Sequence, residues 1–124
     1  MTLELTPDLI AKYRAAAQQR WQEEEQAQVR RRERAWAVAR QAAAFLKGEF
    51  GVTRVAAFGS LAHGHWFSDT SDVDLAIWGL TGPDYFTAVA RLQDLSPEFK
   101  IDLVAMEHCR PALHKSIIKG MKLL

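Results

Sequence analysis

A long segment without helix-breaking residues is the feature that most limits what this chain can fold into. Residues 8 to 45 contain neither proline nor glycine, and alanine, arginine, glutamine and glutamate dominate them. These residue types favour the α-helix. Thr6 can cap such a helix, Pro7 suits its first position, and Gly48 and Gly51 mark its end. The pattern predicts a long N-terminal helix.

The apolar residues of this helix fall into two separate stripes. One stripe, spaced by three and four, would pack on a core and comprises Trp36, Ala39, Ala43, Leu46 and Phe50. The other comprises Ile10, Tyr13, Ala17 and Trp21, and residues 22–34 between the two are almost wholly polar. Forty helical residues would measure about 60 Å, roughly twice the width of a small domain. We therefore expect either a break near residues 22–30 or a projecting helix that meets a second chain, for instance in a homodimer.

Beyond Gly51 the pattern changes to alternating strands and helices. Strands are predicted over residues 53–58, 73–78 and 99–105, and helices or turns over residues 60–65, 81–92 and 110–118. This order predicts an α/β fold, in which helices flank a small mixed β-sheet. We expect the functional site of such a fold at the ends of its strands. The chain divides near residue 50, which predicts a helical N-terminal extension over residues 1–50 and a compact domain over residues 51–124.

Three aspartates stand where strands are expected, although aspartate is depleted in strands. Asp72 and Asp74 are two positions apart, so both carboxylates share one face while Val73 points the other way. Asp102 alternates with apolar residues in a later strand. Like charges on one face repel, and a divalent cation would neutralise them; carboxylates are ligands that Mg²⁺ prefers. The alternative is an exposed edge strand with one solvated face.

A Gly-Ser turn precedes these carboxylates. Gly59 follows a predicted strand, and without a Cβ it permits positive φ and a close approach of the backbone to a phosphate. Ser60 would stand at the start of the next helix, where free N–H groups favour anions. A plain turn is the alternative interpretation.

The overall composition narrows the class of protein. The chain has 124 residues, a net charge of +1 and a single cysteine, Cys109. The small net charge gives no general case for direct DNA binding, and the lone cysteine fits a reducing compartment. The basic residues Arg30, Arg31, Arg32 and Arg34 follow three glutamates, so intrahelical pairs on a solvated face explain them. Apolar runs are too short for a membrane span, and the first residues, MTLELTPDL, lack the basic-then-apolar order of a secretory signal. We expect a cytoplasmic protein without membrane contact.

Taken together, Gly59-Ser60, Asp72-Val73-Asp74 and Asp102 resemble the DNA polymerase beta type nucleotidyltransferase superfamily. The greatest likeness is to the minimal nucleotidyltransferases (MNT) that partner HEPN toxins. It runs from about Phe50 to the C-terminus and is most specific at FGSLAHG and SDVDLAI. The resemblance implies a nucleotidyltransferase fold, with residues 51–124 as a minimal nucleotidyltransferase domain.

The resemblance also implies roles for individual residues. Gly59 and Ser60 would bind the triphosphate of ATP. His63, which stands where many minimal members have arginine, could still donate to a phosphate. Asp72 and Asp74 would be ligands of two Mg²⁺ ions, and Asp102, the third candidate metal ligand, would position and deprotonate the acceptor.

The reaction implied is Mg²⁺-dependent transfer of AMP from ATP to a hydroxyl of a protein partner, with release of pyrophosphate. In HEPN–MNT systems that partner is a toxin, and modification of its tyrosine silences its RNase activity. Two alternatives stay open: a small-molecule nucleotidyltransferase of the antibiotic-modifying type, and a non-catalytic antitoxin that acts by contact.

Overall fold

The structure is a computed structural model that describes residues 4–64, 67–80 and 82–124. One helix, α1 (Pro7–Phe50), runs without interruption for 44 residues, which corresponds to about 66 Å. The Oγ1 of Thr6 accepts a hydrogen bond from the backbone N–H of Leu9 at 3.2 Å, and Gly51 ends the helix at φ 68°. The projecting helix is therefore confirmed, and the alternative break near residues 22–30 is wrong.

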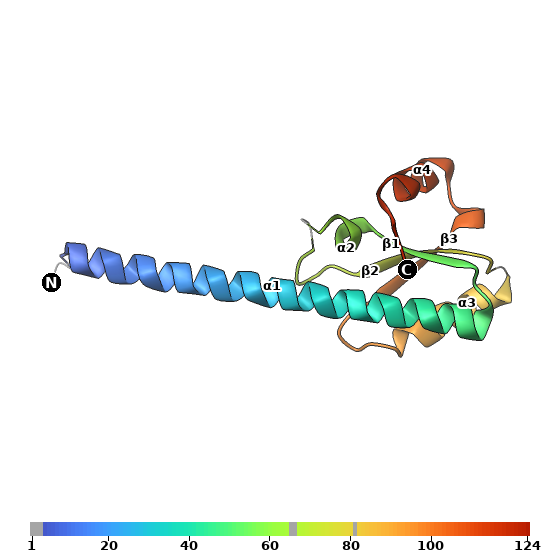
Figure 1. The fold of residues 1–124 in the computed structure, drawn as a ribbon, viewed down its shortest axis with the longest axis horizontal. Helices are drawn as coiled ribbons and strands as arrows, with labels where there is room; N and C mark the ends of the chain where they lie inside the picture. The colour runs from blue at the N-terminus through green and yellow to red at the C-terminus, as the bar shows by residue number, and fades with distance from the viewer. Residues whose placement is uncertain (1–3, 65–66, 81) are drawn as a thin grey trace.

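A four-stranded sheet follows the helix (Figure 1). Its strands are β1 (Arg54–Phe58), β2 (Val73–Trp78), β3 (Ile101–Ala105) and β4 (Lys122–Leu123), in the spatial order β3-β2-β1-β4. Strand β1 is antiparallel to β2 and β4, whereas β2 and β3 are parallel. The connecting helices are α2 (Gly59–His63), α3 (Pro83–Gln93), the 3₁₀ turn η1 (Met106–His108) and α4 (Pro111–Gly120).

The predicted α/β fold is confirmed, with small differences at element boundaries. Strands β1 and β3 begin at Arg54 and Ile101, slightly later than predicted, and the sequence did not indicate η1 or β4. Strand β4 has only two residues and forms because it pairs with β1, as in the pair Ala56 and Leu123. His65 and Thr81, at the edges of two predicted helices, lie outside the described residues.

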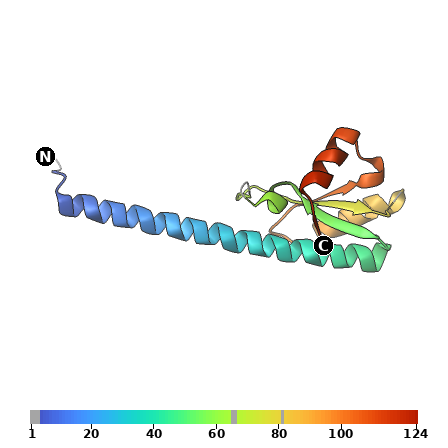
Figure 2. The same cartoon turned by 45° about the horizontal axis from the view of Figure 1, so that its top comes forward.

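The two faces of the sheet are covered by different helices (Figures 1 and 2). Helices α1 and α3 cover the face that carries the main core, to which α1 contributes Ala35, Ala39, Ala42, Ala43 and Leu46. On the other face a smaller cluster joins Ala76 of β2 to Ile117 of α4 and Met106 of η1. The second half of α1 thus belongs to the compact unit, and the domain boundary near residue 50 stays a prediction.

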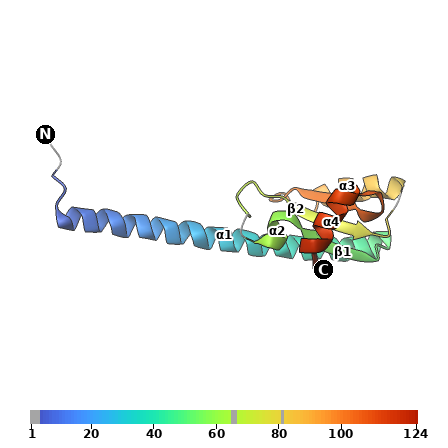
Figure 3. The same cartoon turned by 90° about the horizontal axis from the view of Figure 1, so that it is seen from above.

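The first half of α1 extends beyond the sheet, at the end where α2 lies (Figures 1 and 3). Tyr13 and Trp21 of its apolar stripe are 59% and 69% exposed, so this part of the helix has no core of its own within the described chain. Among the residues that the structure describes, no helix is long and apolar enough to cross a membrane.

Candidate active site

The parallel pair of strands brings two of the predicted carboxylates together. Asp74 of β2 lies directly opposite Asp102 of β3, and adjacent strands are about 4.8 Å apart. The neighbouring residues Val73 and Leu75 are fully buried in the main core on the opposite face. The alternation predicted from the sequence is therefore present, and it directs Asp74 and Asp102 to the face that α4 covers.

Asp72 lies at the entrance to β2, two residues before Asp74. It is partly buried, like Asp74 and Asp102. A backbone bond from the N–H of Val73 to the carbonyl of Lys100, at 2.9 Å, joins the starts of the two strands. The three carboxylates consequently stand at the same end of the sheet.

The Gly-Ser turn adjoins these carboxylates because β1 is antiparallel to β2. Phe58, the last residue of β1, pairs with Asp74, so Gly59 follows beside that carboxylate. Gly59 has φ +69°, and a Cβ atom built on it would lie 2.5 Å from Oδ2 of Asp74. The left-handed backbone favours glycine here, and a side chain at this position would have to displace the carboxylate of Asp74.

Ser60 and His63 belong to the short helix α2, in its first turn and at its last residue. His63 and Gly59 line a cavity of about 230 Å³ together with Phe58, Leu113, Ser116, Ile117 and Gly120. A Cβ atom on Gly120 would lie 2.7 Å from Cε1 of His63, so Gly120 makes room for the imidazole. The structure therefore places His63 at the same cavity as the Gly-Ser turn.

The carboxylates influence one another electrostatically. Burial in the first place, and then the negative charges of Asp102 and Asp72, raise the pKa of Asp74 to about 6, against a smaller opposing effect of Lys100. Such a shift means that the cluster holds negative charge only at a cost in free energy. A cation bound there would remove that cost.

The donor set fits Mg²⁺, which prefers oxygen ligands. In the described part of the chain, no group of three or more His, Cys, Asp or Glu side chains is close enough to enclose a metal ion by itself. Mg²⁺ usually takes one or two carboxylates and completes its shell with water and phosphate oxygens. Asp72, Asp74 and Asp102 therefore suit a site that a nucleotide completes, and their roles as metal ligands stay a prediction.

Sequence reasoning missed two residues of this site. Lys100 lies 3.6 Å from Oδ1 of Asp102 through its Nζ; its position two residues before Asp102 was a signal that both share one face. Gly120 was interpreted only as the end of the last helix, because its contact with His63 depends on how α4 packs.

A larger cavity, of about 600 Å³, lies elsewhere, at the edge of the sheet formed by β3. Its lining includes Tyr85, Phe86, Leu103, Cys109 and Leu113. None of the predicted site residues lines it, so we do not assign it to the site.

Comparison with known proteins identifies the family of this chain. Residues 40–124 match the family model described as polymerase beta, nucleotidyltransferase. The chain therefore belongs to the polymerase beta type nucleotidyltransferase family, as the motifs indicated. A search of curated protein sequences found no match to this chain.

Two solved structures share the fold. One is a crystal structure of a mutant of the toxin–antitoxin MntA-HpeT, with a TM-score of 0.57 and 16% identity over 68% of this chain and 70% of that chain. The other is a crystal structure of a toxin–antitoxin with AMP-PNP, with a TM-score of 0.52 and 18% identity over 64% of each chain. At these identities the likeness concerns the fold.

Proposed function

We propose that this chain is a Mg²⁺-dependent nucleotidyltransferase that transfers AMP from ATP to a hydroxyl of a protein partner in the cytoplasm. The observation that carries the proposal is the pairing of Asp74 with Asp102 beside Gly59. Family membership supports the reaction class. The two similar structures are both called toxin–antitoxin, and one of them is with AMP-PNP, which supports a toxin partner and an adenine nucleotide.

Each site residue has a role in this proposal. The backbone at Gly59 and Ser60 approaches the triphosphate, and His63 donates to a phosphate from the shared cavity. Asp72 and Asp74 hold Mg²⁺, of which we propose two ions, with Asp102 as a further ligand. Bound Mg²⁺ would neutralise charge that develops on the phosphates.

The reaction proceeds by attack of the acceptor oxygen on the α-phosphorus of ATP. A new oxygen–phosphorus bond forms, the bond from the α-phosphorus to the bridging oxygen breaks, and pyrophosphate leaves. Asp102 accepts the proton of the acceptor hydroxyl, for which it must be ionised. Its neighbour Lys100 forms an ion pair with it, with Nζ 3.6 Å from Oδ1 of Asp102.

The partner in this proposal is a HEPN-type toxin, whose modified residue would be a tyrosine. The cavity beside Gly59 measures about 230 Å³, which is below the usual size of a pocket for a drug-sized ligand. An acceptor presented by another protein needs no such pocket. This favours a protein acceptor over a small molecule.

The test is transfer of label from α-³²P-ATP with Mg²⁺ to purified proteins and to host lysate. We expect a labelled protein band with the wild type and none with Asp72→Asn/Asp74→Asn. The matched control is Asp84→Asn, because Asp84 is exposed on the first turn of α3, beyond the opposite end of β2; it should label like the wild type.

Other outcomes lead to the alternatives. Labelling that is absent while Mg²⁺-dependent ATP binding persists would contradict protein modification and favour a small-molecule acceptor. Absence of nucleotide binding as well would favour a non-catalytic antitoxin that acts by contact. Binding itself is measured as a rise in melting temperature on addition of ATP and Mg²⁺.

A further inference from the structure

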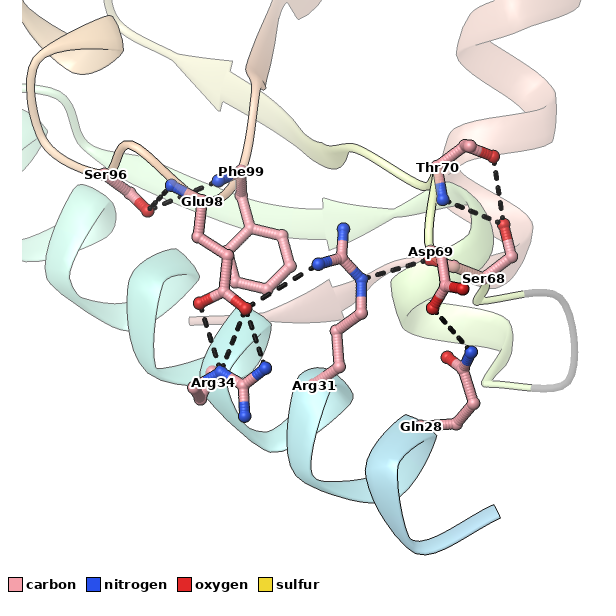
Figure 4. A network of polar contacts seen from close by, with 9 residues as sticks. All are labelled: Gln28, Arg31, Arg34, Ser68, Asp69, Thr70, Ser96, Glu98 and Phe99. Carbon is pink, nitrogen blue, oxygen red and sulfur yellow. Dashed lines mark hydrogen bonds and ion pairs between the residues drawn. The ribbon is translucent and has the colours of Figure 1, made fainter. Parts of the chain in front are cut away.

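A cluster on α1 contacts both loops that lead into the carboxylates (Figure 4). We call Gln28, Arg31 and Arg34 the α1 clasp. All three precede residue 40, where the match to the family begins. The clasp is therefore a feature of this chain's own N-terminal helix, and it needs an explanation apart from the family domain.

Arg31 is the centre of the clasp. Its Nε donates to the backbone carbonyl of Ser68 at 3.3 Å, and its Nη1 lies 3.6 Å from Oε1 of Glu98. Its guanidinium also lies 4.6 Å from the ring centroid of Phe99, and its side chain is only 17% exposed. One guanidinium thus joins loop 67–71 to loop 96–99.

These contacts correct one expectation. The arginines of α1 were expected to pair within the helix, yet Arg31 and Arg34 both pair with Glu98, which lies far along the chain. The hydrogen bond from Arg34 also holds the pKa of Glu98 below its usual value. The sequence could not reveal this partner because it is brought near only by folding.

Loop 67–71 links Arg31 to Asp72. The loop is closed by a bond from the N–H of Ser68 to Oγ of Ser71 at 2.8 Å and a return bond from the N–H of Ser71 to the carbonyl of Ser68 at 3.1 Å. Gln28 adds a bond of 2.7 Å to Asp69. Because Asp72 follows Ser71 directly, a closed turn held at Ser68 restrains it.

Loop 96–99 links Arg31 to Asp102 in a similar way. Oγ of Ser96 accepts bonds from the N–H groups of Glu98 and Phe99, at 3.3 and 3.4 Å. Phe99 is 3% exposed and stands three residues before Asp102. The guanidinium of Arg31 contacts both the ring of Phe99 and the carboxylate of Glu98. It therefore holds the loop that leads into β3.

We propose that Arg31 is a positioning residue that sets the spacing between Asp72 and Asp102, so that the N-terminal helix completes the site for Mg²⁺ and nucleotide. The inference rests on the proposed function. Lysine cannot replace this residue, because its ammonium lacks the plane that lies on Phe99 and the Nε donor that reaches Ser68.

The test is the Mg²⁺ concentration that gives half-maximal binding of AMP-PNP by the full-length protein, measured calorimetrically. We expect Arg31→Gln to raise it about ten- to hundredfold, the usual effect of removing a group that orients metal ligands. Arg34→Gln is the matched control: Arg34 bonds to the same Glu98 at 2.7 and 3.0 Å and, among the described residues, makes no bond to loop 67–71. It should stay within about threefold of the wild type.

Arg31→Lys is a second variant that serves if Arg31→Gln does not fold, because lysine keeps a positive charge facing Glu98. We expect it to remain folded and still to need more Mg²⁺ than the wild type. Equal Mg²⁺ requirements for Arg31→Lys or Arg31→Gln and the wild type, with only a lower melting temperature, would overturn the proposal. Failure of the wild type itself to bind AMP-PNP with Mg²⁺ would instead overturn the proposed function and, with it, this inference.

Discussion

The carboxylate of Asp74 occupies the space that a side chain on residue 59 would need. Oδ2 of Asp74 is 2.5 Å from the position of a Cβ atom on Gly59, a distance at which two atoms overlap. Gly59 also has φ +69°. The turn that would hold the triphosphate and the strand that would hold the metal are thus packed directly against each other, and a change in either disturbs both.

We predict that Gly59→Ala lowers the free energy of unfolding by about 1–3 kcal/mol, because alanine must adopt a strained backbone and displace Asp74. It should also abolish the rise in melting temperature caused by ATP and Mg²⁺.

The control is Gly48→Ala, in α1, where nothing lies within 4 Å of the added Cβ. That variant should gain about 0.5–1 kcal/mol, as measured by urea unfolding. Equal stability of the two variants would contradict the prediction.

The raised pKa of Asp74 predicts that stability falls as pH rises. The folded protein binds the proton of Asp74 up to about pH 6, whereas the unfolded chain releases it near its ordinary value of 3.8. Between these values the folded state carries more protons, so the free energy of unfolding decreases with increasing pH. Urea unfolding without Mg²⁺ should therefore show a stabilising contribution near pH 4 that is lost above pH 6.

Asp74→Asn should remove this dependence and, at pH 7.5 without Mg²⁺, be more stable than the wild type. Asp84→Asn provides the control and should keep the wild-type dependence. Since Mg²⁺ binds the ionised carboxylate, its stabilising effect on the wild type should also be smaller at pH 5 than at pH 7.5. An Asp74→Asn variant with the same pH profile as the wild type would show that another group is responsible.

Gly120→Ala should affect ligand binding more than folding. The added methyl group would lie 2.7 Å from Cε1 of His63, but that side chain is exposed and can rotate away. Alanine favours the helix by about 1 kcal/mol over glycine, so stability should not fall. We expect weaker ATP binding by calorimetry, and no further loss in His63→Ala/Gly120→Ala relative to His63→Ala, because both changes act through one side chain.

The two halves of α1 should respond differently to truncation of a large side chain. Leu46 is 0% exposed in the main core, so Leu46→Ala should cost about 2–5 kcal/mol in urea unfolding. Trp21 is 69% exposed, and Trp21→Ala should change the stability of a monomer by no more than about 0.5 kcal/mol. A similar loss in both variants would contradict the difference between the two halves of α1.

We also predict that the exposed stripe at Ile10, Tyr13 and Trp21 contacts a second chain, with a homodimer as the first case to test. Light scattering should then give a dimer for the wild type and a monomer for Trp21→Glu, because a charge in a buried apolar contact is costly. Glu24→Gln, on the same projecting half of α1, is the control. A monomeric wild type would exclude the homodimer.

Local chemistry was enough to predict most of the secondary structure. The helix-forming composition, the cap at Thr6 and the end at Gly51 act within one turn of the chain, so they can be recognised without the fold. The alternation of Asp72 and Asp74 with apolar residues likewise defined the two faces of β2. The motif at Gly59 and Ser60 allowed the family to be recognised.

By itself, the sequence determined the residue types of the site, the face on which the carboxylates stand, and the helical character of the N-terminal segment. Only the tertiary structure decided that Asp102 lies opposite Asp74, that Gly120 makes room for His63, and that Arg31 joins two loops. Each of these depends on which strands pair and how helices pack. Those choices are made by burial of the whole core, and residues distant along the chain carry no local signal of them.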